Sequence, residues 1–321
     1  MILCCGEALI DMVPGTVSGK GDCYFPCPGG SPYNTAIAIG RLGTPVQFLG
    51  KLSTDFFGDA LVDRLVRNQV GTDFITRSDQ HSTLAFVKLA ADREPRYVFY
   101  TEGAADRSLS MDDIPSAMPP ELSCILFGSI SMTMEPIAST LETFIFREKS
   151  RTNAAPLVSL DPNIRPFMIG HREGYIRRLE KWLTCSAIVK LSAADLGFIY
   201  PGLSFEEASQ KMFALGVRLV VITMGTEGAM ALLRREDESF NRVKAPVVEL
   251  PVVDTIGAGD TFHGAFLSWL ETNGKMSRSA ITSLSGEDLY EALYFANKAA
   301  SIVCSKRGAE PPFMSELALL P

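Results

Sequence analysis

The stretch Val253-Asp254-Thr255-Ile256-Gly257-Ala258-Gly259-Asp260-Thr261-Phe262 guides the interpretation of the whole chain. Its centre, residues 257–259, carries no bulky side chain, and apolar residues follow at helical spacing at Phe262, Phe266, Trp269 and Leu270. This pattern predicts a helix that begins near Asp260. The bare backbone N–H groups before such a helix and the positive end of its dipole form a site for an anionic oxygen.

Asp260 is unusual in an anion site, because a carboxylate repels phosphate. Two interpretations are open. Asp is a favoured N-cap residue, so Asp260 could cap its own helix. Alternatively, it could take the proton from a hydroxyl that attacks phosphorus, as a general base does in phosphoryl transfer.

The composition is that of a globular protein. The chain has 321 residues, of which 46% are apolar and 21% are charged, enough for one large or two ordinary domains. With 30 basic and 37 acidic residues the net charge is -7, which argues against a broad nucleic-acid or anionic-membrane surface. We therefore expect neither a nucleic-acid partner nor a membrane partner.

The cysteines and the N-terminal segment indicate the compartment. The seven cysteines are odd in number and scattered, which favours reduced thiols over a disulfide framework. The chain enters an apolar strand at Ile2 without a charged leader, and no apolar run reaches membrane-spanning length. The expected location is the cytoplasm.

Short apolar runs alternate with longer amphipathic ones. The expected strands are Ile2–Cys5, Val46–Leu49, Ile125–Phe127, Leu157–Leu160, Ile188–Leu191 and Leu219–Thr223. The helical stretches between them include Pro32–Leu42, Phe57–Asn68, Glu173–Leu183 and Ser204–Leu215. The alternation predicts an α/β fold with an open, mostly parallel sheet covered by helices on both faces. Such sheets bind ligands beyond the carboxyl ends of their strands.

Two motifs for nucleotide binding are missing from the sequence. It contains no Gly-x-x-x-x-Gly-Lys-[Ser/Thr] segment, so a P-loop enzyme is excluded. No Gly-x-Gly-x-x-Gly follows the first strand, which removes the best support for dinucleotide binding.

Polar residues near the first strand suit a polyol. Asp11 follows that strand, and the turn Gly29-Gly30 leads into a helix with Asn34 on its first turn. A carboxylate and an amide offer acceptors and donors to sugar hydroxyls. Taken singly, Asp11 could equally be a turn carboxylate, and the glycines could serve the turn alone.

The segment Gly29-Gly30…Asn34, followed far downstream by residues 254–260, resembles the two signatures of the ribokinase-like (PfkB) carbohydrate kinases. The resemblance covers essentially the whole chain. It implies a single catalytic domain, residues 1–321, with a three-layer α/β/α core and a small β-sheet lid. It also implies transfer of phosphate from ATP to a sugar hydroxyl, with Mg²⁺ as cofactor.

Four further segments look like bacterial fructokinases: Gly6–Pro14, Glu102–Asp106, Gly128–Ser131 and Asp161–Pro166. In the last of these, Arg165 follows a strand end, where its guanidinium could clamp the γ-phosphate or substrate oxygens. A surface ion pair is the alternative. The 2-keto-3-deoxygluconate kinases share much of this pattern. A catalytically silent sugar or nucleotide sensor on the same fold is a further alternative.

The resemblance implies a role for each matching residue. Asp260 would be the base, and the backbone of Gly257, Ala258 and Gly259 would hold the transferring group together with Arg165. Asp11, Gly29, Gly30 and Asn34, with Asp260, would hold the sugar. ATP and its magnesium would lie along Lys190, Ser192, Asp195, Thr223, Gly225, Gly228, Gly259 and Asn297. The family usually has Asn-x-x-Glu where this chain has Ser192 and Asp195.

The loop at residues 308–312 resembles the family's monovalent-cation loop, with Asp254 and Ile256 completing the site. Pro312 stands where a serine is usual. The resemblance implies potassium as the cation of this site.

Two segments outside the helical pattern predict the lid, residues 12–27 and 82–101. The second is expected to be a hairpin that turns through Asp92-Arg93-Glu94-Pro95. In the family the lids of two subunits often pack together, and Phe86, Val98 and Tyr100 would suit a homodimer contact. The same side chains could instead cover the core of one subunit.

Overall fold

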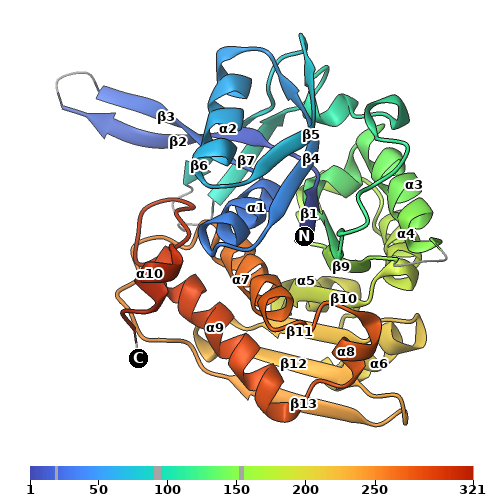
Figure 1. Ribbon diagram of the computed structural model, residues 1–321. Helices are drawn as coiled ribbons and strands as arrows, with labels where there is room; N and C mark the ends of the chain where they lie inside the picture. Colours follow the sequence, from blue (N-terminus) through green and yellow to red (C-terminus); the bar gives the residue numbers. More distant parts are fainter. Residues whose placement is uncertain (19–20, 90–94, 152–154, 321) are drawn as a thin grey trace.

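A computed structural model describes residues 1–18, 21–89, 95–151 and 155–320. A large sheet forms the centre, with the strand order β13-β12-β11-β10-β9-β8-β1-β4-β5 (Figure 1). Neighbours from β5 to β11 pair in parallel, whereas β12 is antiparallel to both β11 and β13. The mostly parallel sheet expected from the sequence is confirmed.

The strands of the large sheet are β1 (Ile2–Cys5), β4 (Val46–Ser53), β5 (Gly71–Ser78), β8 (Cys124–Gly128), β9 (Leu157–Asp161), β10 (Ile188–Ser192), β11 (Leu219–Thr223), β12 (Ala229–Arg234) and β13 (Phe240–Ala245). The six expected strands are all present. The pairs β4–β5 and β12–β13 extend the sheet at its two edges.

The helices are α1 (Ser31–Arg41), α2 (Phe56–Arg67), α3 (Ile137–Lys149), α4 (Arg172–Cys185), α5 (Ala193–Ile199), α6 (Phe205–Ala214), α7 (Ala258–Thr272), α8 (Arg278–Thr282), α9 (Gly286–Cys304) and α10 (Met314–Leu317). Short 3₁₀ turns η1 to η5 lie at Asp106–Ser108, Met111–Asp113, Ser129–Thr133, Pro166–Met168 and Gly225–Glu227. Among the described helices, none is long and apolar enough to cross a membrane.

The helices cover both faces of the sheet (Figure 1). One core joins the sheet to α1, α2, α7 and α9, through side chains such as Ile37, Leu65, Phe266 and Leu293. The other core lies under α3, α4, α5 and α6. The central strand β1 is completely buried, as expected for a parallel strand between two helical layers. The predicted three-layer architecture is therefore confirmed.

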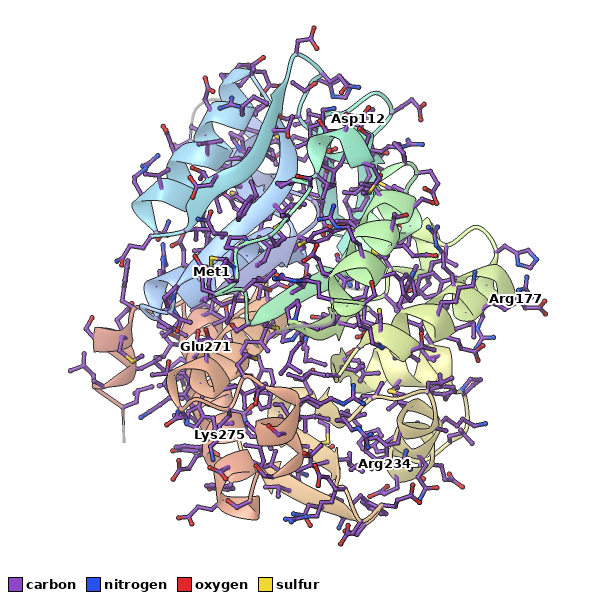
Figure 2. The ribbon with its side chains drawn as sticks, turned by 45° about the vertical axis from the view of Figure 1, so that its right-hand side comes forward. Met1, Asp112, Arg177, Arg234, Glu271 and Lys275 are labelled. Atoms are coloured by element: carbon purple, nitrogen blue, oxygen red, sulfur yellow. The ribbon has the colours of Figure 1, made fainter. Side chains whose placement is uncertain are left out.

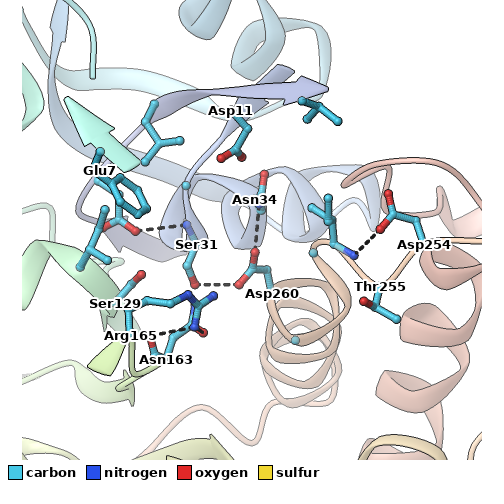
Figure 3. Close-up of a pocket in the computed structure, with 18 of the residues that line it drawn as sticks. Glu7, Asp11, Ser31, Asn34, Ser129, Asn163, Arg165, Asp254, Thr255 and Asp260 are labelled. Atoms are coloured by element: carbon cyan, nitrogen blue, oxygen red, sulfur yellow. Dashed lines mark hydrogen bonds between the residues drawn. The ribbon is translucent and has the colours of Figure 1, made fainter. Parts of the chain in front are cut away.

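Helices α1 and α7 pack closely because α7 has a glycine at the contact. A Cβ atom added at Gly264 would lie 2.9 Å from the Ala38 Cβ and 2.9 Å from the Thr35 carbonyl oxygen. The two helices bring their N-terminal ends to the same place at the carboxyl edge of the sheet (Figure 3). This placement brings residues 31–34 beside Asp260.

The far end of α7 is fixed near the start of β1. The N-terminal ammonium of Met1 lies 2.6 Å from Oε1 of Glu271, and Oγ of Ser123 donates to the same oxygen at 2.9 Å (Figure 2). Both ends of α7 are thus held by contacts with other parts of the chain.

A second, small sheet has the strand order β3-β2-β6-β7. Its strands are β2 (Leu9–Val17), β3 (Gly21–Gly29), β6 (Leu84–Leu89) and β7 (Pro95–Tyr100), and β2 and β3 project from the body as a long hairpin (Figure 1). The two segments expected to leave the helical pattern do form this sheet. The predicted turn at residues 92–94 lies outside the described residues.

Candidate active site

A cavity of about 600 Å³ lies where the small sheet meets the carboxyl ends of the large-sheet strands (Figure 3). Its polar lining residues are Glu7, Asp11, Ser31, Asn34, Ser129, Asn163, Arg165, Asp254, Thr255 and Asp260, and the backbone at Gly30, Gly257 and Gly259 completes it. Phe99 contributes an apolar wall from β7. Most of the residues expected to act in catalysis and sugar binding therefore line one cavity.

Asp260 does not cap its own helix. The N-cap of α7 is Gly257, and Asp260 is the third helical residue, with 9% of its surface exposed. Its Oδ1 accepts a hydrogen bond from the Ser31 hydroxyl at 2.7 Å, and its Oδ2 accepts one from Nδ2 of Asn34 at 2.9 Å. The capping alternative is therefore wrong, and the carboxylate faces the cavity between two donors from α1 (Figure 3).

Burial raises the pKa of Asp260, and the hydrogen bonds from Ser31 and Asn34 oppose that rise. A positive charge below it comes from Lys190, whose buried ammonium lies 2.8 Å from Oδ2 of Asp161. Burial would raise the pKa of Asp161, but Lys190 and His263 lower it to about 2. Asp260 is thus a buried carboxyl with a raised pKa in the lining of a cavity, which is a property of general bases.

The N-terminus of α7 suits an anion. Gly257 has a left-handed backbone with φ of 75°, and an added Cβ would lie 2.7 Å from the Ala309 Cβ. A Cβ at Gly259 would lie 3.0 Å from the Lys190 ammonium, so Lys190 sits directly beneath this turn. The first helical N–H groups, the helix dipole and a buried cation therefore meet at one point.

Asp11 enters the cavity because Gly29 leaves room for it. The two residues are diagonal neighbours in the β2–β3 ladder, where Leu9 pairs with Gly29 and Asp11 with Cys27, and any Cβ at Gly29 would clash with the Asp11 carboxylate. Burial and the nearby Asp260 raise the pKa of Asp11 to about 7, and Arg165 opposes the rise.

Asn34 has one free acceptor in the cavity. Its Nδ2 is used by Asp260, whereas its Oδ1 is buried and has no hydrogen-bond partner among the described residues. Figure 3 places the Asn34 side chain between Asp11 and Asp260. A buried acceptor without a partner at this position fits a ligand hydroxyl.

Glu7 was not among the residues selected from the sequence. It follows β1, is only 1% exposed, and accepts hydrogen bonds from the backbone N–H of Ser31 at 3.2 Å and from the side chain of Ser131. Burial raises its pKa to about 7, against the effect of these hydrogen bonds. A carboxylate directly after a buried strand is the signal that could have identified it.

Arg165 lines the cavity instead of forming a surface ion pair. Its Nη1 donates to the side-chain oxygen of Asn163 at 2.9 Å and to backbone carbonyls of the same turn. These contacts leave the guanidinium in the lining of the cavity, where its charge opposes the rise that burial causes in the pKa of Asp11 (Figure 3).

Ser192 and Asp195 have a local structural function. They form the capping box of α5, in which the Ser192 hydroxyl accepts from the Asp195 N–H and donates to Oδ2 of Asp195. The other oxygen, Oδ1, accepts from the Ile164 N–H at 2.8 Å. Neither residue lines the cavity described above, so this structure does not join them to Asp260.

The remaining nucleotide candidates lie around the end of β11. Thr223 is its last residue, and Gly225 and Gly228 bracket the turn η5. Asn297 is buried on α9 and donates through Nδ2 to the carbonyls of Ala245 and Pro246. Its amide therefore fixes the backbone that follows β13.

Asp254 connects the two segments of the predicted cation site. Its Oδ1 accepts from the Ile256 N–H at 3.1 Å, and its Oδ2 accepts from the Gly308 N–H at 2.9 Å. The 254–256 and 308–312 segments are therefore neighbours.

Comparisons with known proteins agree with this arrangement. The model of the pfkB family of carbohydrate kinases matches residues 1–316. A fructokinase of Rhizobium leguminosarum bv. trifolii is 36% identical over 291 residues, which cover 90% of this chain and 85% of the relative.

Two solved structures extend the comparison to the fold. The crystal structure of a fructokinase from Xylella fastidiosa with bound ATP matches with a TM-score of 0.88 at 30% identity, and the match covers 99% of this chain and 97% of that one. A fructokinase from Vibrio cholerae O395, with fructose, ADP and a calcium ion bound, matches with a TM-score of 0.81 at 26% identity, covering 99% and 97%. The family match over nearly the whole chain shows that this protein belongs to the pfkB family of carbohydrate kinases.

Proposed function

We propose that this protein is an ATP-dependent fructokinase, which converts D-fructose and ATP to D-fructose 6-phosphate and ADP. The observation that carries the proposal is the position of Asp260, which faces the cavity at the N-terminus of α7 beside Asn34 and Ser31. The fructokinase relatives, similar over most of the chain, support this choice of sugar.

In the proposed reaction, Asp260 accepts the proton of the sugar's primary hydroxyl as that oxygen attacks the γ-phosphorus. The new bond joins the sugar oxygen to phosphorus, and the bond from phosphorus to the ADP oxygen breaks. The backbone N–H groups of residues 257–260 and the Arg165 guanidinium hold the charge on the transferring group. Asp11, Asn34 and the turn at Gly29-Gly30 hold the sugar, and the small sheet excludes water through Phe99.

The charge of the cavity favours a neutral sugar over a sugar acid. Its lining carries four carboxyl groups, at Glu7, Asp11, Asp254 and Asp260, against the single guanidinium of Arg165. A 2-keto-3-deoxygluconate carboxylate would lie among these carboxyl groups, each of which repels it when ionised, at a cost in binding. This difference supports fructose over the acidic alternative.

Magnesium would accompany ATP and supply positive charge against the phosphate oxygens. Within the described residues there is no group of three or more metal-ligating side chains, and both oxygens of Asp195 already accept hydrogen bonds. This donor set does not fit a metal held directly by the protein, so no step is assigned to one. A potassium site between the segments that Asp254 joins is part of the proposal.

The proposal includes a homodimer through the small sheet and a cytoplasmic location. Val98 and Tyr100 are 57% and 58% exposed on β7, which supports a contact with a second subunit. All seven cysteines are free thiols, which supports a reducing compartment.

A sugar panel tests the function. ADP release is measured by a coupled assay with fructose, 2-keto-3-deoxygluconate and ribose, in potassium and in sodium chloride, and the product is identified by ³¹P NMR. We expect fructose to give the highest kcat/KM and fructose 6-phosphate as product, with faster turnover in potassium. ADP release that does not depend on any sugar would refute the kinase assignment, and a preference for the sugar acid would refute fructose.

A further inference from the structure

The hydroxyl of Ser31 has no part in the reaction described so far, although it makes the shortest contact to Asp260. It donates to Oδ1 of the carboxylate at 2.7 Å, while Asn34 donates to Oδ2 at 2.9 Å. Both oxygens are therefore held by donors from the first turn of one helix (Figure 3). A hydroxyl that donates to a carboxylate stabilises its ionised form.

Ser31 is itself held in place. The N-cap of α1, Gly30, has no side chain that could cap the helix, and the first helical N–H belongs to Ser31. Glu7 accepts from this N–H at 3.2 Å, and Ser131 anchors Glu7 from the turn after β8. The backbone of Ser31 is thus held by the segment that follows β1, by η3 and by its own helix α1.

A neighbouring hydroxyl shows what a purely local contact looks like. Thr35, one turn further along α1, donates to the Ser31 carbonyl at 2.9 Å, which is an ordinary helical partner. Ser31 instead bonds a side chain 229 residues away in the sequence.

Building on the proposed role of Asp260 as base, we propose that Ser31 is a positioning residue that keeps Asp260 in the orientation and the ionised state that proton acceptance requires. Ser31 touches the base, not the transferring group, and acts through it. The proposal names no new substrate and depends on the sugar kinase reaction only for its kinetic readout.

Other charged groups also act on Asp260 and must stay constant in the test. Lys190 on β10 lowers its pKa, whereas Asp161 on β9 raises it. Asp11 on β2 lies close enough for its pKa to be raised by Asp260, and Arg165 faces Asp11 from the turn after β9. Glu7 acts through the backbone of Ser31. None of these is altered by a substitution at Ser31.

The test is the pH profile of kcat/KM for Ser31→Ala. Loss of the donated hydrogen bond disfavours the carboxylate, so the acid limb, where activity falls as Asp260 becomes protonated, should move to higher pH by about one unit. At pH values well above the limb, the variant should stay within about threefold of the wild type, because the base is then ionised in both. Ser31→Thr keeps the hydroxyl. Its acid limb should therefore lie at the wild-type pH, even if its maximal kcat/KM differs from that of the wild type.

Thr35→Val is the matched control, since it removes a hydroxyl from the same helix without touching Asp260. Its limb should not move. An acid limb at the wild-type pH in Ser31→Ala, or an equal shift in Thr35→Val, would overturn the proposal.

A second readout separates this inference from the proposed function. The ¹³C carboxyl resonance of Asp260, assigned by its absence in Asp260→Asn, is titrated in the wild type and in Ser31→Ala. The midpoint should rise in the variant even if no sugar is phosphorylated, and an unchanged midpoint would refute the Ser31–Asp260 link. A wild type without sugar-dependent ADP release would refute only the kinase reaction.

Discussion

At the scale of single residues, burial sets the chemistry of the cavity. The three carboxyls Glu7, Asp11 and Asp260 all have raised pKa values, and in each case burial is the largest cause. They differ in their donors. Asp260 accepts hydrogen bonds from two side chains, whereas Glu7 accepts them from a serine hydroxyl and from backbone N–H groups. One carboxyl can therefore serve as a base while the other holds the backbone in place.

The buried Glu7 carboxyl should make the free energy of unfolding depend on pH. Its pKa is about 7 in the folded protein against 4.5 as its ordinary value, so between these pH values the folded state binds the extra proton. The free energy of unfolding should therefore fall as pH rises from 5 to 8. In Glu7→Gln this fall should shrink by about 1 to 3 kcal/mol, measured by urea denaturation at both pH values. Asp11 still titrates, so part of the fall should remain.

Glu102→Gln is the control, because the Glu102 side chain is 94% exposed. Its unfolding free energy should follow the pH dependence of the wild type. An unchanged dependence in Glu7→Gln would mean that Glu7 is ionised at neutral pH without cost, contrary to its burial.

The residues of the site could be predicted from the sequence more fully than their hydrogen-bond partners. Spacing and resemblance selected Asp260, Asn34 and Asp11, and all three line the cavity. Whether Asp260 capped its helix stayed open, because both roles suit an Asp at a helix start, and only the position of Gly257 as N-cap decides it. The link from Glu7 to Ser31 spans 24 residues and exists only once β1 and α1 are packed together.

At the scale of helices and strands, the close packing of α1 on α7 aligns the donors with the base. Gly264→Ala tests it, because the new Cβ would meet the Thr35 carbonyl, which belongs to the helix backbone and cannot rotate away. We expect the free energy of unfolding to drop by about 1 to 3 kcal/mol, and kcat to fall as Ser31 and Asn34 shift from Asp260. Urea denaturation and steady-state kinetics measure the two effects.

Gly197→Ala on α5 is the matched control, since an added Cβ there meets nothing within 4 Å. It should leave kcat unchanged and raise stability by up to about 1 kcal/mol, through helix propensity. A Gly264→Ala protein as stable and active as the wild type would contradict the packing argument.

The sequence located buried elements well and edge elements poorly. Strand β11 matches its prediction at both ends, because its apolar run is buried on both faces. No strand was expected at β5, β12 or β13. Strand β5 is only half-buried, and β13 alternates exposed residues such as Arg242 and Lys244 with inward ones, so pairing with a neighbour decides their structure.

At the scale of the whole molecule, the small sheet carries four exposed large apolar side chains among its described residues. Tyr24 and Phe25 on the edge strand β3 are 45% and 48% exposed, and Val98 and Tyr100 lie on the opposite edge strand, β7, while the hairpin β2–β3 projects from the body (Figure 1). A second subunit that covers this sheet would bury these side chains and restrict the motion of the sheet, which forms one wall of the cavity. The proposed dimer therefore bears on activity as well as on assembly.

Val98→Asp tests the dimer by sedimentation velocity. A charge at this exposed position should convert a dimeric wild type to monomers, because burying an unpaired carboxylate is costly. Phe240→Asp, on the edge strand β13 and 43% exposed, is the control and should stay dimeric. A wild type that sediments as a monomer at micromolar concentration would contradict the proposal.

In the proposed reaction, Asp260 takes the proton of the attacking hydroxyl. This role is tested by the rate of a single turnover of Asp260→Asn with saturating ATP and fructose, followed by rapid quench, with binding of both ligands measured by calorimetry. The isosteric amide still reaches Ser31 and Asn34 but is a far weaker base, so the rate should fall at least about a hundredfold while both ligands still bind and the fold is retained. Phosphoryl transfer at a near-normal rate in this variant would contradict the account.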